Sequence, residues 1–224
     1  MRSDNFIYPI NKDFIYNNPE IFKILYEFNY LPAAYLHQTR RIKFFSGQIP
    51  EKVWLEPRVW PRLSTVILDE LGIEKEPIRN LVNADSFHLL LPSNRFLRLA
   101  KHIGSIVLAS CIRTSVARDE VLSWKKKLGS DVFDFVMSRS ALFPSSITNL
   151  ETLAINDVER IGCGVLLEVY QGLPENLLSR VMLKMPDQTE KIQIDHKVGR
   201  QLVQLVVFLL EREWVSLFQT DQAM

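Results

Sequence analysis

The chain has 224 residues, enough for one large domain or two small ones, and its 27 Lys+Arg against 26 Asp+Glu give a formal net charge of +1. Its 47% hydrophobic and 24% charged residues are typical of a globular protein, which excludes intrinsic disorder over most of the chain. The nearly balanced charge also excludes a global attraction to nucleic acid or anionic lipid, so any such contact requires a local basic patch.

The first predicted helix begins at Pro19, after a stretch without hydrophobic period. We expect this stretch, residues 1–17, to form an N-terminal arm. Proline is favoured at the first helical position because its missing backbone donor has no partner to lose there. The apolar stripe of the helix consists of Ile21, Phe22, Leu25 and Phe28. Pro32 disfavours helical backbone at the residue before it, so the helix should end near Asn29 in an aromatic corner.

The segment after the corner is rich in Trp and Pro. Three prolines within residues 49–61 forbid a long helix there. Trp54 and Trp60 must therefore pack either under this loop or onto a partner. A helix is predicted over residues 62–71, with Gly72 as its left-handed end.

The rest of the chain follows the hydrophobic period of helices. The strongest pattern predicts a central core helix from Ser93 to about Arg118, in which Gly104 indicates a closely crossing backbone. Further helical segments are predicted within residues 121–129, 132–144, 148–172, 174–186 and 195–214. Asp195 is expected to cap the last of these helices.

These patterns predict an all-α, mainly helical protein. Residues 191–194 are the best candidate for a strand, so we expect at most a short β element there. The predicted organisation is an arm over residues 1–17 and one compact multi-helix domain over residues 18–224. A subdivision near residues 74–92 is the alternative, because the start of that segment is polar and linker-like.

No secretory signal or membrane span is predicted. The first nine residues contain no continuous apolar core and no small-residue cleavage site, so we expect no signal peptide. The most apolar window, residues 202–210, is interrupted by Gln204 and is far shorter than the ~20 residues that a membrane helix requires. We therefore expect a cytoplasmic protein that does not insert into a membrane.

No group of residues predicts a catalytic, metal or cofactor site. The histidines are scattered at His37, His88, His102 and His196, without the spacing of a metal site. The pair of glycines at residues 162–164 lacks the preceding strand and third glycine of a dinucleotide-binding turn, so close helix packing is the simpler interpretation. Cys111 and Cys163 fall in apolar runs typical of core positions, with a disulfide between them left open. We therefore predict a non-enzyme without cofactors.

Two short stretches combine cations with aromatic rings, at residues 40–45 and 124–127. Such stretches occur in nucleic-acid sites, and they suit an acidic protein partner equally well. A helical nucleic-acid-binding regulator is therefore an alternative function. A helical enzyme of unrecognised type is a less favoured one, because it requires a pocket with convergent polar groups.

One combination of features resembles a known family. It consists of the aromatic-Leu-Pro-Ala-Ala-Tyr-Leu-His corner at residues 30–37, the Trp/Pro loop at residues 49–61 and the Leu-Asp-Glu-Leu segment at residues 68–71. Together these are similar to the SctK (YscK-like) family, the accessory cytosolic proteins of bacterial type III secretion systems. The resemblance is most specific over residues 31–37.

The resemblance implies a non-enzymatic adaptor in the sorting platform beneath the injectisome. Family members link the cytosolic domain of the inner-membrane ring protein (SctD type) to the pod protein (SctQ type). Through the pod protein they connect indirectly to the stator (SctL type) and the ATPase. The protein would then support protein secretion from the cytoplasmic side, peripheral to the inner membrane, without binding nucleic acid.

An adaptor of this kind binds through surface contacts alone. We expect the corner to shape one docking surface, and the tryptophan loop or the basic patch to contribute another. The residues assigned to these surfaces are Tyr30, Pro32, Tyr35 and His37 at the corner, and Arg40, Arg41, Lys43, Trp54 and Trp60 beyond it. Tyr, Trp and Arg are the side chains most often found as binding hot spots. For each residue, packing inside the domain is the alternative.

Overall fold

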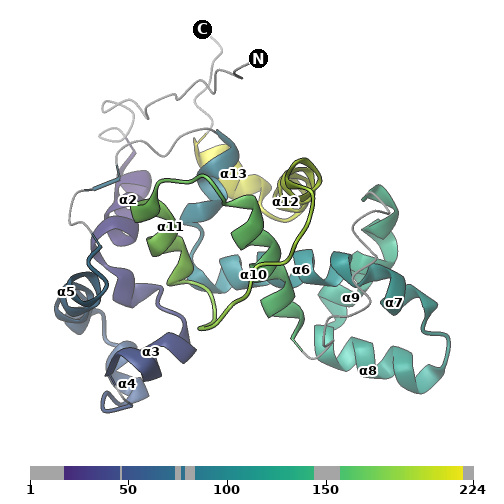
Figure 1. The fold of residues 1–224 in the computed structure, drawn as a ribbon, viewed down its shortest axis with the longest axis horizontal. Coiled ribbons are helices and arrows are strands. Elements are labelled where there is room, and N and C mark those ends of the chain that lie inside the picture. Colours follow the sequence, from purple (N-terminus) through teal and green to yellow (C-terminus); the bar gives the residue numbers. More distant parts are fainter. Residues whose placement is uncertain (1–17, 46, 74–76, 79–83, 144–156, 219–224) are drawn as a thin grey trace, which may run out of the picture. The chain divides into compact units, whose positions relative to one another are not determined.

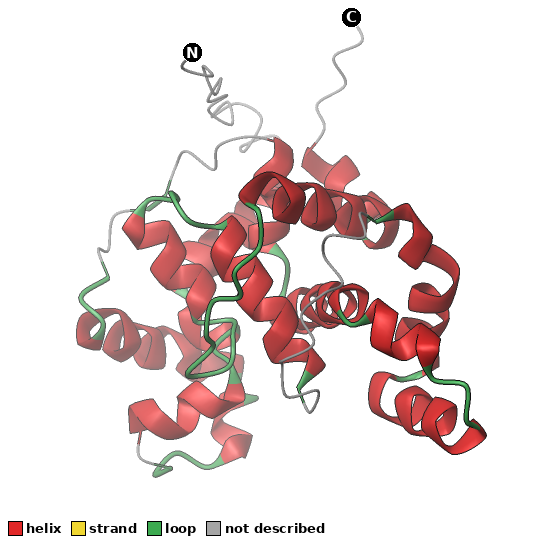
Figure 2. Cartoon of the chain, turned by 45° about the vertical axis from the view of Figure 1, so that its right-hand side comes forward, coloured by secondary structure: helices red, strands yellow, loops and turns green. Residues whose placement is uncertain are grey.

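The fold is all-α, as the sequence predicted. The computed structural model describes residues 18–45, 47–73, 77–78, 84–143 and 157–218, and its regular elements there are α-helices and short 3-10 helices without a strand (Figure 2). None of the described helices is both long and apolar enough to cross a membrane. The predicted arm over residues 1–17 and the predicted helix start at residues 148–149 lie outside the described residues.

Figure 1 labels the α-helices in chain order. Their bounds are α2 (Pro19–Tyr30), η1 (Pro32–Ala34), α3 (Gln38–Phe45), α4 (Glu51–Trp54), η2 (Pro57–Val59), α5 (Trp60–Glu70), η3 (Ala84–Leu90), α6 (Ser93–Val107), α7 (Ala109–Thr114), α8 (Arg118–Leu128), α9 (Ser130–Arg139), η4 (Ser140–Leu142), α10 (Val158–Val169), α11 (Glu175–Met182), α12 (His196–Leu210) and α13 (Arg212–Phe218).

The chain divides into two compact units, each discontinuous in sequence. The first unit is drawn from Met1–Phe96, Leu173–Asp187 and Glu211–Met224, and the second from Leu97–Gly172 and Gln188–Leu210. The first boundary therefore falls inside α6, after the subdivision near residues 74–92 that the sequence offered as an alternative.

In the first unit, the corner after α2 forms the centre of the packing. Pro32 begins η1 directly after α2, which confirms the predicted end of that helix. Both α2 and α5 pack against η1, and the backbone N–H of Ala33 donates to Ser64 Oγ of α5 at 3.1 Å. The most deeply buried apolar side chains of these two helices are Ile21, Phe28 and Ile67.

In the second unit, α6 and α10 cross so closely that only glycine fits at the contact. A Cβ added at Gly104 of α6 would overlap the carbonyl oxygen of Val158, and one added at Gly162 of α10 would overlap the carbonyl oxygen of Ala100. The close backbone crossing predicted from Gly104 is thus confirmed. Because Gly162 and Gly164 lie inside a helix, they pack elements together and do not form a dinucleotide-binding turn.

Two details of the second unit differ from the prediction. The core helix ends at Val107 and α7 starts at Ala109, because Leu108 leaves the helical region with φ −91° and ψ 10°; the apolar period continues across this break and predicted a single helix. The candidate strand at residues 191–194 is irregular backbone that contacts α10, since the backbone N–H of Ile192 donates to the carbonyl of Gly164 at 3.3 Å. No described strand lies beside it, so it has no ladder to join.

The start of α12 and the burial of Cys163 are as predicted, whereas Cys111 is only half-buried. Asp195 Oδ1 accepts a hydrogen bond from the backbone N–H of Val198 at 3.0 Å, which confirms the predicted cap. Cys163 is buried in α10 and Cys111 is half-buried in α7, and the structure shows no disulfide between them.

Candidate functional site

The nine residues predicted to bind partners all lie in the first unit, and four of them are buried. The buried ones are Pro32, Tyr35, His37 and Trp54. Arg40, Arg41, Lys43 and Trp60 are intermediate or exposed, and Tyr30 is exposed. The four buried side chains can therefore shape a surface only through the residues that they support.

The corner is held from inside the core. Tyr35 stacks on Phe28 with ring centroids 5.8 Å apart, and its hydroxyl donates to the Phe28 carbonyl at 2.8 Å. Burial raises the pKa of Tyr35, because the phenolate would lose its hydration there. The backbone N–H of His37 donates to the carbonyl of Leu183 at 2.8 Å. Packing inside the unit, the alternative interpretation of this corner, is what the geometry shows.

The predicted basic patch is engaged in internal contacts. Arg40 Nε donates to the carbonyl of Met185 at 2.8 Å, and its guanidinium lies 3.6 Å from the Asp187 carboxylate. Lys43 lies 3.5 Å from the same carboxylate but keeps an exposed side chain. Because the guanidinium of Arg40 is held by the chain itself, Lys43 is the more accessible of these two cations.

Arg41 and the two tryptophans form a second internal cluster. Arg41 donates from Nε to the carbonyl of Leu36 at 3.0 Å, contacts Glu51 at 2.6 Å and lies over the Trp54 ring at 5.1 Å. Trp60 Nε1 donates to the carbonyl of Trp54 at 2.8 Å. The structure thus buries Trp54 inside the unit, one of the two positions that the sequence allowed, whereas Trp60 is half-buried at the start of α5.

Three aromatic rings form an exposed row on α2. Of these three residues, only Tyr30 was predicted from the sequence to bind a partner. Phe22, Tyr26 and Tyr30 recur every fourth residue, with exposed fractions of 52%, 46% and 39%. Their ring centroids lie 6.4 Å and 5.2 Å apart in succession. We call these three residues the aromatic ladder. Four-residue spacing puts side chains on one helical face, and this signal was available in the sequence.

The prediction that Phe22 faces the core was therefore wrong. Ile21 and Phe28, seven residues apart, define the buried side of α2. One residue corresponds to a rotation of about 100° around a helix, so Phe22 turns away from Ile21. An apolar residue next to a core position is thus displayed at the surface, together with Tyr26 and Tyr30.

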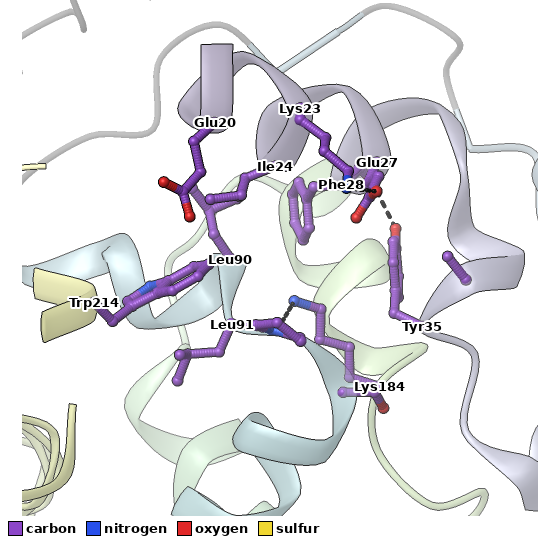
Figure 3. Close-up of a pocket in the computed structure, with 13 residues that line it drawn as sticks. Glu20, Lys23, Ile24, Glu27, Phe28, Tyr35, Leu90, Leu91, Lys184 and Trp214 are labelled. Atoms are coloured by element: carbon purple, nitrogen blue, oxygen red, sulfur yellow. Dashed lines mark hydrogen bonds and ion pairs between the residues drawn. The ribbon is translucent and has the colours of Figure 1, made fainter. Parts of the chain in front are cut away.

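A cavity of about 270 Å³ lies on another face of α2, and the sequence gave no sign of it (Figure 3). Its charged lining from α2 consists of Glu20, Lys23 and Glu27, and Lys184 enters from the segment after α11. The apolar and aromatic lining includes Ile24, Phe28, Tyr35, Leu90, Leu91 and Trp214. Figure 3 shows α2 along one side of the cavity, with Lys184 reaching toward Phe28 from the opposite side.

Lys184 is a lysine with 1% exposure, held by carbonyls and aromatic rings. Nζ donates to the carbonyls of Leu89 at 2.6 Å and Leu91 at 2.7 Å. It lies 4.9, 5.2 and 5.7 Å from the ring centroids of Phe28, Tyr35 and Phe96, respectively. Burial lowers the pKa of Lys184 to about 7. The carbonyls and ring faces suit an ammonium group, whose positive charge they stabilise.

No family model, curated protein or solved structure matches this chain.

Two of the histidines, His37 and His102, have polar partners close by in the sequence. His37 Nδ1 lies 2.8 Å from Thr39 Oγ1. His102 Nδ1 donates to the carbonyl of Arg98 at 2.8 Å, and the ring meets Phe135 edge-on at 4.9 Å. Burial lowers the pKa of His102. Among the described residues, no group of three or more His, Cys, Asp or Glu side chains is arranged to hold a metal ion.

Proposed function

We propose that the protein is a non-enzymatic adaptor of a bacterial type III secretion sorting platform. In this role it links the cytosolic domain of an SctD-type ring protein to an SctQ-type pod protein, and through the pod protein it reaches the SctL-type stator. It acts in the cytoplasm, peripheral to the inner membrane, at the base of the secretion apparatus. Binding alone accounts for this function.

The observation that carries the proposal is the aromatic ladder on α2. Three large rings are displayed side by side with about half of each exposed, although the same helix buries Ile21 and Phe28. Isolated apolar residues are ordinary on a protein surface, but contiguous aromatic residues are characteristic of interaction sites. Tyr is also one of the residues most often found as a binding hot spot.

The corner that resembles the SctK family holds the end of the helix that carries the aromatic ladder. Tyr35 donates to the carbonyl of Phe28, and Pro32 ends the helix directly after Tyr30. These contacts fix the end of α2, which carries the last ring of the ladder. The residues that gave the resemblance would then act by positioning the ladder, while the ladder itself contacts the partner.

The test is a quantitative binding assay of the full chain against the two partners from the same genome. We expect Phe22→Ser combined with Tyr26→Ser to weaken binding to the SctD-type domain or the SctQ-type protein by at least about tenfold, since truncated hot spots cost ~2 kcal/mol or more. Both positions are exposed, so the double variant should fold as the wild type does, which circular dichroism can verify.

Val66→Ser is the matched control. Val66 is an exposed apolar residue of α5 in the same unit, with 46% exposure, and it is not part of the ladder. Its replacement should leave both affinities unchanged. The proposal is wrong if the folded wild-type chain binds neither partner. Equal affinities for the wild type and the double variant would instead remove the ladder from the interface.

A further inference from the structure

The buried amino group of Lys184 has no counter-ion among the residues that the structure describes. An ammonium group has three N–H donors, and the carbonyls of Leu89 and Leu91 accept two of them. Lys184 forms no ion pair with any carboxylate of the described residues; its other contacts are with three aromatic rings. Buried charges in proteins are normally paired, because their removal from water costs several kcal/mol. The third N–H therefore has no oxygen acceptor among the described residues, and Lys184 lines the cavity.

The cavity next to Lys184 has the composition of a small-molecule site. Aromatic and aliphatic side chains make up most of its wall, and a few charged groups lie around it. Trp214 is fixed in the wall by a hydrogen bond from Nε1 to the carbonyl of Phe87 at 2.9 Å. Leu90 and Leu91 are buried, so the apolar wall is built by core residues of the unit.

We propose that this cavity binds a small carboxylate with an apolar or aromatic body, whose carboxylate becomes the counter-ion of Lys184. The third N–H of the ammonium group would donate to a carboxylate oxygen, while the body of the ligand packs against Phe28, Leu91 and Trp214. Such a charge-assisted hydrogen bond in a covered site is stronger than a neutral one. This binding site is independent of the adaptor function and of the aromatic ladder.

The charges around the cavity favour a single anionic group at Lys184. On α2, Lys23 lies 3.9 Å from Glu27, so these two side chains largely compensate each other, and Glu20 is exposed. From the other side, Tyr35 stays neutral because burial raises its pKa, and the buried Arg180 adds positive charge near it. An anion placed at Nζ therefore meets the positive charge of Lys184, whereas an organic cation would be repelled by it.

The test uses phenylacetate as the probe and its uncharged analogue phenylacetamide as the comparison. Titration of the full chain at about pH 6, where Lys184 is charged, should show saturable binding of phenylacetate by calorimetry and by Trp fluorescence. Phenylacetamide has nearly the same shape but no charge, so we expect its affinity to be at least about tenfold lower.

Two variants separate Lys184 from the cation at the cavity edge. Lys184→Met should weaken phenylacetate binding by at least about tenfold, whereas Lys23→Met should change it less than about threefold. If Lys184→Met does not fold, heteronuclear NMR of the Lys184 side chain in the wild type replaces it. Binding of the anion should then raise the pKa of Lys184, because an opposite charge favours the ammonium form.

The proposed site would be refuted by equal affinities for the acid and the amide, or by the absence of saturable binding. The proposal would also be refuted if Lys23→Met lost binding while Lys184→Met still bound phenylacetate, or while the Lys184 resonances did not change. The anion would then be held at the cavity edge. None of these measurements involves the secretion partners, so their outcome is separate from that of the adaptor assay.

Discussion

The interiors of the two units are packed in different ways. In the first unit, the core around the corner encloses a charge: Lys184 is surrounded by three rings and two carbonyls. In the second unit, α6 and α10 meet backbone to backbone at Gly104 and Gly162, with no side chain between them.

This difference should determine how the stability of each region responds to substitutions and to pH. Where the backbones of two helices are in contact, there is no room for an added atom. The stability of this helix contact therefore depends on steric fit and should not vary with pH. A buried amino group can gain or lose a proton, so the stability of its surroundings should vary with pH but tolerate small changes of shape. Three measurements can test this contrast.

The largest effect should come from Gly162→Ala in the second unit. The new Cβ would overlap the backbone carbonyl of Ala100, and backbone cannot move aside without separating the two helices. We expect a loss of about 3 kcal/mol or more in the free energy of unfolding, well above the ~1 kcal/mol gained from helix propensity. Urea denaturation measures this difference.

Gly199→Ala in α12 is the matched control. There the added Cβ would approach the side chains of Val169 at 2.8 Å and Ile194 at 3.2 Å, which can adjust more easily than backbone. The gain in helix propensity should offset most of the crowding, so stability should stay within about 1 kcal/mol of the wild type. Equal losses for Gly162→Ala and Gly199→Ala would contradict the account of the crossing.

The second effect is a dependence of stability on pH that is due to Lys184. Between pH 7 and 10, an unfolded chain keeps this proton, because the ordinary pKa of lysine is 10.5, while the folded chain releases it above about 7. The unfolded state then binds more protons, so the free energy of unfolding should rise with pH, by about 1 kcal/mol per pH unit. Below pH 7 both states are protonated and this contribution no longer changes.

Denaturation of the wild type and of Lys184→Met at several pH values in this range checks the prediction. The variant should lack the rise, because methionine fills a similar volume without a titrating group. An identical rise in both proteins would assign it to other residues. Above about pH 10 the trend should reverse, since the raised pKa of Tyr35 lets the unfolded chain lose its phenol proton first.

The smallest effect should come from Tyr35→Phe. The substitution keeps the ring that lies 5.2 Å from Lys184 Nζ but removes the hydroxyl that donates to the Phe28 carbonyl. We expect a loss of about 1 kcal/mol near pH 7, the usual contribution of one buried hydrogen bond. The pH dependence assigned to Lys184 should remain. If the slope between pH 7 and 10 disappeared as well, the hydroxyl and the amino group would be titrating as one system.

The elements of the fold could be predicted where the signal is local. Pro32 ended α2, Gly72 adopts φ +59° after α5 and Asp195 capped α12, because each of these effects depends on backbone geometry within a few residues. The helix break at Leu108 was not predictable in this way, since the apolar period runs through it unchanged.

The candidate site could be predicted only in part. The sequence picked out aromatic and cationic residues at residues 30–60, but it could not separate those that pack inward from those that are displayed. Phe22 and Ile21 are neighbours of similar hydrophobicity, yet one is 52% exposed and the other buried. That choice depends on which side of α2 meets the core, and the core is built by segments far away in the sequence.

The sequence by itself determined that the chain is helical, where several helices begin and end, and that Gly104 needs a close neighbour. These properties follow from hydrophobic period, proline and glycine, whose effects are local. Only the tertiary structure decided that Lys184 is buried among Phe28, Tyr35 and Phe96. Phe28 and Tyr35 lie more than a hundred positions from Lys184 in the sequence. A single lysine in an apolar stretch carries no local signal of the side chains that surround it in the fold.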